Sequence, residues 1–370
     1  MHIAVPTESS PGELRVAVTP DSAARLVKAG HSVRVQSGAG VRAGFPDDSF
    51  SAVGASVAAG ASVYEGAELV CRVQPPNPEE IAALPQGVAL LSLLNPGRNA
   101  AVLDGLAARG VTALALELVP RITRAQSMDV LSSQSTVAGY KAVLIGASAL
   151  PKFLPMLTTA AGNVSPAKVF IIGAGVAGLQ AIATARRLGG VVSAFDVRPA
   201  AREQVLSLGA TFVANDLVAA GAETSGGYAR AQSDDEAQRT RDALAAHIKD
   251  MDLVVTTAQI PGRAAPRLIT AEMVASMKPG AVIVDLAAES GGNCELTVSG
   301  ETVHSGNVTI LGPTNVAASV PFHASQMFGK NILALVTHLA AKDGALVIDA
   351  GDEITGAMTV VRDGSVVTRS

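Results

Sequence analysis

A glycine-rich turn in the middle of the chain has the residue types and spacing that hold a pyrophosphate. Gly173, Gly175 and Gly178 form a G-x-G-x-x-G pattern that follows the apolar run 167–172 and precedes a helical pattern over 179–188. The first glycine of such a turn permits the tight bend, the second leaves room for phosphate against bare backbone, and the third lets the helix pack closely on the strand. The N–H groups that begin the helix then face the phosphates. The pattern predicts a dinucleotide-binding site.

A second apolar strand, residues 191–195, ends at Asp196, the place where an acidic residue binds the ribose 2′-hydroxyl of NAD. Arg198 offers an alternative, because an arginine there can receive the 2′-phosphate of NADP. A carboxylate in the ribose position would repel that phosphate, so the sequence favours NAD over NADP. A glycine-rich turn that binds nothing is the structural alternative, and strand, helix and acid together disfavour it. The other cofactor-binding positions predicted around the turn are Ala174, Val176 and Val197.

Short apolar runs and helical patterns alternate from the start of the chain. Strands are predicted at 2–5, 32–36, 69–73, 88–94 and 111–116, and after the glycine-rich turn at 253–256 and 281–285. In the second half of the chain each strand follows a helical pattern, as a parallel sheet requires. We therefore predict an α/β fold with two Rossmann-like doubly wound domains joined by long crossing helices.

Helix signals give the domain limits. Thr19-Pro20-Asp21 predicts an N-cap with proline at the first helical position, and Gly30 closes that helix. Patterns over about 130–150 and 324–341 predict helices that cross between domains, and 358–368 predicts a hairpin around an Asp-Gly turn. The first α/β domain is then expected to comprise 1–128 with 318–370, and the dinucleotide-binding domain 129–317.

Composition excludes several classes of function. The 370 residues carry a formal net charge of −4 without a basic run, which argues against a nucleic-acid surface. Cys71 and Cys294 have neither metal-ligand nor disulfide spacing, so we expect buried, inert thiols and no metal site. The longest stretch without charged residues, 302–329, contains two prolines and two histidines, and the N-terminus lacks the regions of a signal peptide. A soluble cytoplasmic protein without membrane insertion is expected.

A polar insertion over 218–237 interrupts the regular spacing. It contains Gly226-Gly227-Tyr228 and three consecutive acidic residues, 234–236, so it is too polar to pack. Two interpretations stay open: a solvated surface loop, or a mobile lid over the cofactor with Tyr228 at its tip.

The segment 121–141, RITRAQSMDVLSSQSTVAGYK, resembles very closely the NAD(H)-binding component, domain I, of the proton-translocating NAD(P)+ transhydrogenases. Further matches are FDVRP at 195–199, the Gly-Gly-Tyr segment, and TTAQIPGRAAP at 256–266, so the resemblance extends over nearly the whole chain. A related family, alanine dehydrogenase, has a similar fold and domain order.

The resemblance implies roles for individual residues. Arg121 and Asp129 match loop residues that hold the carboxamide end of nicotinamide, Ser132 lies beside them, and Gln126 matches the residue that reaches toward the partner's NADP(H). It assigns Gly173, Gly175, Gly178 and Asp196 to the adenosine half, Tyr228 to the lid, and Thr257, Ala258 and Gln259 to cofactor binding. For the loop, the structural alternative is a polar segment with a capping Asp or Ser.

The resemblance also implies the reaction and the partners. Hydride would pass directly between NADH on this chain and NADP+ on an NADP(H)-binding subunit, which needs placement of two rings more than acid–base chemistry. The chain would form a homodimer and associate through the NADP(H)-binding and membrane-spanning subunits with the cytoplasmic side of the inner membrane. Only that assembly would be catalytically complete and translocate protons.

An alanine dehydrogenase-like activity is the nearest alternative, because PTE at 6–8 and RVAVTP at 15–20 are shared with that family. That family uses an arginine, a lysine and a histidine to bind a carboxylate and shuttle protons. Here Arg15 remains, but Gln74 and Asn95 stand at the other two positions, and neither amide can titrate. Lys28 and His31 are expected at the surface, and Arg15 in an ion pair with Glu8 or Glu13. A non-catalytic NAD-binding module is the third alternative.

Overall fold

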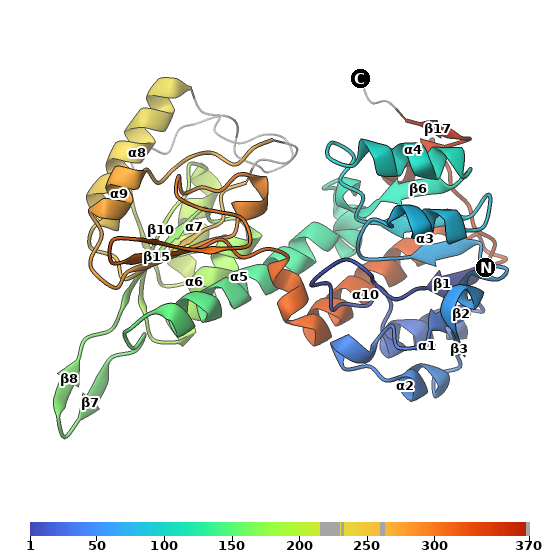
Figure 1. Cartoon of the computed structure of the whole chain (residues 1–370), viewed down its shortest axis with the longest axis horizontal. Coiled ribbons are helices and arrows are strands. Elements are labelled where there is room, and N and C mark those ends of the chain that lie inside the picture. Colours follow the sequence, from blue (N-terminus) through green and yellow to red (C-terminus); the bar gives the residue numbers. More distant parts are fainter. Residues whose placement is uncertain (215–229, 231–232, 260–262, 368–370) are drawn as a thin grey trace. The chain divides into compact units, whose positions relative to one another are not determined.

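The structure is a computed structural model that describes residues 1–214, 230, 233–259 and 263–367. The chain divides into two compact units, unit 1 of residues 1–134 with 317–370 and unit 2 of residues 135–316 (Figure 1). Each unit is built on a sheet of mainly parallel strands with helices around it. The predicted α/β class with two doubly wound, Rossmann-like units is confirmed.

The sheet of unit 1 has the strand order β17-β16-β6-β5-β4-β1-β2-β3. Its parallel strands are β1 (His2–Val5), β2 (Ser32–Gln36), β3 (Ser56–Ala58), β4 (Leu69–Cys71), β5 (Ala89–Ser92) and β6 (Thr112–Ala115). The chain returns to add β16 (Thr359–Arg362) and β17 (Ser365–Val366) antiparallel at the β6 edge. Asp363 and Gly364 both have positive φ (51° and 71°), which the predicted Asp-Gly hairpin turn requires.

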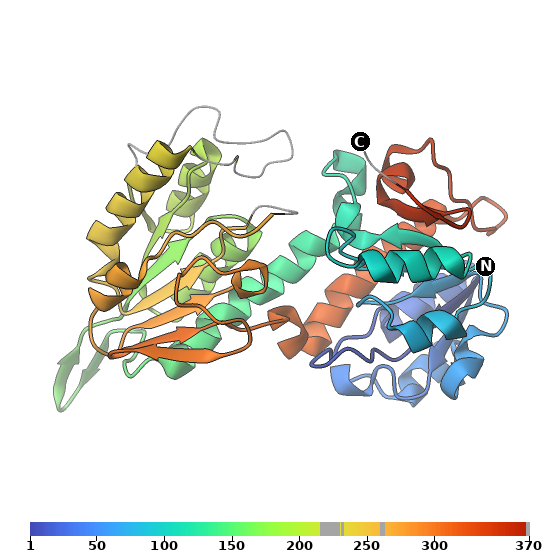
Figure 2. The ribbon, with the colours of Figure 1, turned by 45° about the horizontal axis from the view of Figure 1, so that its top comes forward.

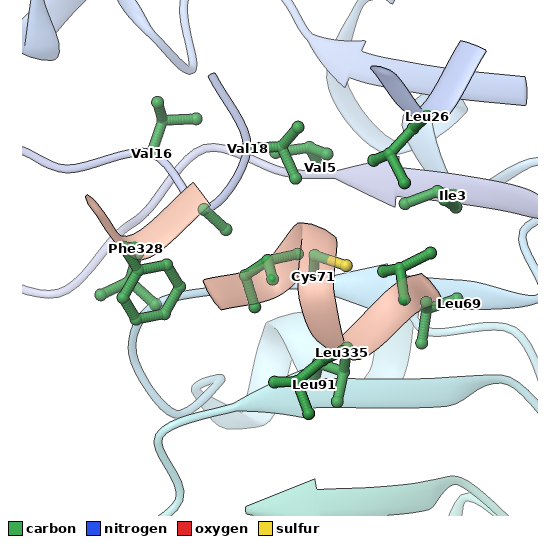
Figure 3. Close-up of a cluster of buried hydrophobic side chains, with 14 of the residues drawn as sticks. Ile3, Val5, Val16, Val18, Leu26, Leu69, Cys71, Leu91, Phe328 and Leu335 are labelled. Atoms are coloured by element: carbon green, nitrogen blue, oxygen red, sulfur yellow. The ribbon is translucent and has the colours of Figure 1, made fainter. Parts of the chain in front are cut away.

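The helices of unit 1 are α1 (Pro20–Lys28), α2 (Asp47–Ser51), α3 (Pro78–Ala83), α4 (Ala100–Ala108), α10 (Pro321–Leu339) and α11 (Glu353–Met358), with short 3₁₀ turns at Val41–Ala43, Gly60–Tyr64, Leu116–Leu118, Thr123–Met128 (η4) and Val316–Ser319. Figure 3 shows Phe328 and Leu335 of α10 packed with strand residues such as Val5, Cys71 and Leu91. The apolar stripe of α10 therefore closes one core of this unit.

Two helix predictions for unit 1 need correction. The Thr19 side chain makes no capping hydrogen bond to α1, although the helix begins at Pro20 as predicted. Helix α10 begins at Pro321, three residues earlier than expected, because proline fits the first helical turn, where its missing N–H costs nothing.

The sheet of unit 2 has the strand order β11-β10-β9-β12-β13-β15-β14. It comprises β9 (Lys168–Ile172), β10 (Val191–Phe195), β11 (Thr211–Phe212), β12 (Leu253–Thr256), β13 (Val282–Asp285), β15 (Val308–Leu311) and the antiparallel edge strand β14 (Thr302–Ser305). Strands β7 (Leu157–Thr159) and β8 (Gly162–Val164) form a separate hairpin. The parallel strands of both units follow the order 3-2-1-4-5-6 of dinucleotide-binding sheets.

Helices cover both faces of the unit 2 sheet. They are α5 (Val130–Ala149, shared with the end of unit 1), α6 (Val176–Arg187), α7 (Pro199–Ser207), α8 (Asp234–Ile248) and α9 (Ala271–Ala275), with a 3₁₀ turn at Ala288–Ser290. Alternate residues of β9 enter different cores: Ile171 packs in one, and Phe170 packs with Leu244 of α8 in the other. In Figure 2 the yellow helix α8 lies along that second face.

The prediction of a polar loop over 218–237 is wrong for its last four residues, 234–237. Residues from Asp234 onward belong to α8, because Ser233 and Glu236 form a capping box that satisfies the first N–H groups of the helix. The three acidic residues 234–236 thus occupy the first helical turn, where negative charge is favourable. Tyr228 and residues 218–229 lie outside the described residues.

Both cysteines are buried free thiols, as predicted. Burial raises the pKa of Cys71 to about 12, so this thiol is inert at neutral pH. Among the residues that the structure describes, no helix is both long and apolar enough to cross a membrane.

Helices α5 and α6 of unit 2 approach each other backbone to backbone. A Cβ atom on Gly139 of α5 would lie only 2.0 Å from the carbonyl oxygen of Ala177 on α6. The first turn of α6 can therefore pack on α5 only because residue 139 has no side chain.

Gly139→Ala should lower the free energy of unfolding by about 2–3 kcal/mol, because the new methyl group meets rigid backbone and forces the helices apart. Chemical denaturation followed by circular dichroism measures this difference. Gly97→Ala is the matched control, since nothing lies within 4 Å of its added Cβ, and it should change stability by less than about 0.5 kcal/mol. Equal stability of the two variants would contradict the packing argument.

Candidate dinucleotide site

The glycine-rich turn of unit 2 has the predicted geometry. Gly173 follows β9 with φ 93°, a conformation that L side chains rarely adopt. Gly175 is the N-cap of α6, so the first N–H groups of this helix open beside it. A Cβ on Gly178 would lie 1.8 Å from the Gly173 carbonyl oxygen. Gly173 and Gly178 therefore stand where the backbone requires a glycine, whereas a Cβ on Gly175 would meet only the Arg198 side chain, at 3.9 Å.

Asp196 lies beside this turn at the end of β10. Its carboxylate accepts hydrogen bonds from the backbone N–H of Ala174 (2.7 Å) and from the backbone N–H of Arg198 (2.9 Å). The Arg198 guanidinium adds a bidentate contact, with Nε and Nη2 each 3.0 Å from a carboxylate oxygen. The acid predicted from spacing is thus brought to the turn, and Arg198 pairs with it.

The segment after β12 completes the surroundings of the turn. Thr257 donates its hydroxyl to the Gly173 carbonyl (3.0 Å), and its backbone N–H donates to Ile172. Ala258 is half-buried, and the exposed Gln259 donates its side-chain amide to the Leu286 carbonyl. Gly173 and Thr257, predicted from separate motifs, therefore touch.

The loop residues predicted from the resemblance lie in unit 1. Arg121 and Gln126 are exposed, and the 3₁₀ turn η4 is anchored by the buried Ala125. Asp129 accepts hydrogen bonds from the Ser132 N–H (2.9 Å) and hydroxyl (2.6 Å) at the start of α5. Asp129 and Ser132 thus make the capping contact that the structural interpretation of this loop requires.

A second polar cluster in unit 1 surrounds Arg15. Its guanidinium makes a bidentate contact with Glu13 (2.8 and 2.7 Å) and donates to Gln134 (2.8 Å). Burial alone would raise the pKa of Glu13, but the hydrogen bonds and charge of Arg15 outweigh it and lower that pKa to about 2. The expected ion pair with Glu13 is present, and Gln74 also donates to Glu13 (2.8 Å).

Glu8, the other residue expected to pair with Arg15, contacts different residues. It accepts hydrogen bonds from the N–H groups of Val73 (2.6 Å) and Gln74 (3.1 Å), and it lies 3.7 Å from Arg72. Burial raises the pKa of Glu8 to about 7 despite these contacts.

One surface prediction in unit 1 is wrong. Lys28 is exposed as expected, but His31 is buried, with 7% of its surface exposed. Its pKa is lowered by burial and by the nearby N-terminal ammonium group. His31 lies in the turn between α1, which ends at Lys28, and β2, which begins at Ser32, and its ring points inward there.

Sequence reasoning missed Asp285. This fully buried carboxylate at the end of β13 accepts five hydrogen bonds, from the hydroxyls of Thr256 and Thr297 and from three backbone N–H groups, those of Ala287, Asn293 and Cys294. An acid at the carboxyl end of a predicted buried strand, followed by two glycines, was the signal available in the sequence. Asp285 organises the loop that follows β13.

Comparisons with known proteins agree over both units. Residues 4–138 match the family described as "Alanine dehydrogenase/PNT, N-terminal domain", and residues 142–369 match its C-terminal domain. The chain is 46% identical to an NAD(P) transhydrogenase subunit alpha protein of Rhodospirillum rubrum, with 99% of this chain and 98% of that protein covered. The solved transhydrogenase structure from Sinorhizobium meliloti has a TM-score of 0.90 at 43% identity, covering 99% of this chain and all of that one. A solved L-alanine dehydrogenase has a TM-score of 0.82 at 28% identity, covering 99% and 97%.

Proposed function

The chain belongs to the alanine dehydrogenase/PNT family, and from this we propose that it is the NAD(H)-binding component of an NAD(P) transhydrogenase. Unit 2 binds NAD(H), and its nicotinamide exchanges hydride directly with NADP(H) on a partner subunit. The observation that carries the proposal is the glycine-rich turn with Asp196 beside it, in a chain 46% identical to a protein named as a transhydrogenase alpha subunit.

The pairing of Arg198 supports NAD(H) as the nucleotide. A 2′-phosphate needs a cation to receive it, but the Arg198 guanidinium is hydrogen-bonded to Asp196. The pyrophosphate is received by the N–H groups that begin α6. A ribose with two free hydroxyls fits beside a carboxylate, whereas a 2′-phosphate would be repelled by it.

The loop around η4 supplies orientation in this proposal. Arg121, Asp129 and Ser132 hold the carboxamide end of nicotinamide, and Gln126 reaches toward NADP(H) on the partner. Hydride transfer requires the two reacting carbons about 3–3.5 Å apart and no proton donor, so polar side chains that fix a ring angle suffice. Both Arg121 and Gln126 lie at the surface of unit 1, and a partner can reach Gln126 there.

The structural likeness to an L-alanine dehydrogenase favours amino-acid oxidation as the second candidate. That reaction requires a cation for the substrate carboxylate and a group that moves protons. Arg15 already binds the carboxylate of Glu13 in bidentate geometry, and Gln74 donates an amide to the same carboxylate. These contacts favour the transhydrogenase assignment. A non-catalytic NAD-binding module would show NADH binding alone.

The assembly we propose contains the NADP(H)-binding and membrane-spanning subunits. It couples hydride transfer to proton translocation and holds this chain peripherally at the cytoplasmic side of the inner membrane. The chain itself pairs as a homodimer, the commonest symmetric state of soluble oligomers. The β7–β8 hairpin projects from its unit (Figure 1), and apolar side chains around it are exposed: Phe153 by 59%, Met156 by 66% and Val164 by 39%. An isolated two-stranded hairpin is marginal in water, so a partner surface would stabilise it.

Purified protein should bind NADH at least tenfold more tightly than NADPH, because the Asp196 carboxylate repels a 2′-phosphate. Fluorescence titration with each nucleotide measures both affinities. Asp196→Asn should narrow the ratio, while Glu203→Gln, which removes an exposed acid of α7, should leave it unchanged. Equal affinities in the wild type would refute the assignment of NAD(H) to this site.

Gln126→Asn and Asp129→Asn should keep the NADH dissociation constant within about twofold of wild type and slow hydride exchange about tenfold or more. In the second variant the new amide oxygen can still accept the Ser132 N–H, so the fold of the loop survives. Stopped-flow mixing of NADH and an NADP(H) analogue with the NADP(H)-binding component gives the rate, and Ser127→Ala is the control. An unchanged rate would show that the loop is misassigned, and NADH formation from alanine and NAD+ without the partner would favour the dehydrogenase.

Met156→Asp should convert a dimer into a monomer, because a carboxylate would be buried in the pairing surface. Sedimentation equilibrium of the variant and the wild type gives the mass of each. Val347→Asp, a charge placed on another exposed apolar residue, should leave the dimer intact. A monomeric wild type would end the homodimer proposal.

A further inference from the structure

Asn293 makes hydrogen bonds that hold the segment that follows β12 in place. Its side chain is fully buried and makes three hydrogen bonds. The amide oxygen accepts from the Ala258 N–H (3.1 Å), and the amide nitrogen donates to the carbonyls of Ala258 (2.8 Å) and Pro266 (2.9 Å). An asparagine here pairs with Ala258 much as a neighbouring strand would, with one donor and one acceptor.

Asp285 sets the direction of Asn293. The Asn293 N–H donates to the Asp285 carboxylate at 2.7 Å, and Gly291 and Gly292 before it both have positive φ. A Cβ on Gly292 would lie 2.9 Å from that carboxylate. The backbone of residue 293 is therefore held by a turn that only glycines permit and by a fully buried anion.

Residues Thr257 and Ala258, directly after β12, are held by contacts on two sides. On one side Asn293 holds Ala258, and on the other Thr257 donates its hydroxyl to Gly173. A Cβ on Gly173 would lie 3.1 Å from the Ala258 N–H nitrogen. Ala258 therefore lies on the β12 side of the glycine-rich turn, and Asn293 fixes its place there.

The strand order tells which half of a dinucleotide this segment meets. In a sheet of order 3-2-1-4-5-6 the coenzyme crosses the carboxyl end of the first strand, here β9. The adenosine half lies over β10, where Asp196 stands, and the nicotinamide half lies over β12 and β13. Residues 257–259 thus belong to the nicotinamide side.

We propose that Asn293 is a positioning residue for the nicotinamide half of the coenzyme, acting through Ala258 without touching the ligand itself. The inference rests on the proposed NAD(H) site of unit 2. It separates the two halves of the site: Asp196 and the glycine-rich turn hold adenosine and pyrophosphate, and the Asp285–Asn293 pair holds the backbone that faces nicotinamide.

The test compares NADH with 5′-AMP, which occupies the adenosine half alone. Asn293→Ala should weaken NADH about tenfold, because Ala258 and Pro266 lose their buried partners and the segment shifts, and it should leave the 5′-AMP dissociation constant within about twofold. Asn307→Ala, an exposed asparagine of the same unit, is the control and should change neither. Calorimetry with each ligand gives all the constants.

The outcomes are distinct. Wild-type protein that fails to bind NADH would end the proposed function, whereas NADH binding unaffected by Asn293→Ala would overturn only this inference. Equal losses for NADH and 5′-AMP would mean that Asn293 merely stabilises the unit, which also overturns it.

Asn293→Asp gives an independent measurement, and it carries the test if Asn293→Ala does not fold. An ionised carboxylate can still accept from Ala258 but repels the two carbonyl oxygens, so NADH should bind about tenfold more weakly at about pH 8. At about pH 6 some of that loss should be recovered, because burial among carbonyls raises the pKa of the new carboxyl and its protonated form donates. A loss that does not depend on pH, beyond any change in the wild type, would count against the hydrogen-bonding role.

Discussion

The close approach of bare backbone around the start of α6 is the constraint on which unit 2 depends. Residue 178 must lack a side chain because the Gly173 carbonyl oxygen occupies the place of its Cβ, and residue 139 must lack one because of the Ala177 carbonyl. These contacts fix the first turn of α6 against β9 and α5. The N–H groups of that turn are the ones that we propose receive the pyrophosphate, so the packing of the unit and the proposed site share one cause.

The two units have the same strand order and different chemistry at the same topological place. In unit 2 the carboxyl end of the first strand continues into Gly173 and the first turn of α6. In unit 1 the segment after β1 carries Glu8, whose buried carboxylate takes the N–H groups of Val73 and Gln74 after β4. At that point in unit 1 the N–H groups of Val73 and Gln74 are bonded to Glu8, whereas in unit 2 the N–H groups that begin α6 can receive a phosphate. Topology thus provides two switch points, and the local residues favour unit 2 for the dinucleotide site that we propose.

Sequence patterns predicted the elements that carry strong local signals. Buried parallel strands such as β10 and β12 are continuous apolar runs, and the Asp-Gly turn near the C-terminus has few alternative conformations, so their limits matched. The start of α8 was missed because its capping residues look like a polar loop until Ser233 and Glu236 are paired. Asp285 and Asn293 were missed for another reason. Their importance comes from partners distant in sequence, on β12 and in the segment after it, and no local pattern encodes those contacts.

Two arginines support the proposed coenzyme over a small acidic substrate. Arg15 in unit 1 and Arg198 in unit 2 each bind a carboxylate of their own chain through two guanidinium N–H groups. A substrate carboxylate at Arg15 would have to displace Glu13, whose pKa of about 2 shows how strongly the ionised pair is favoured. At Asp196 the situation differs, because a neutral ribose diol places no like charge beside the carboxylate, whereas a 2′-phosphate would. Under the proposed function, the ion pair in unit 1 disfavours a small anionic substrate, the ion pair in unit 2 tolerates a neutral diol, and the N–H groups of α6 receive the negative charge of the coenzyme.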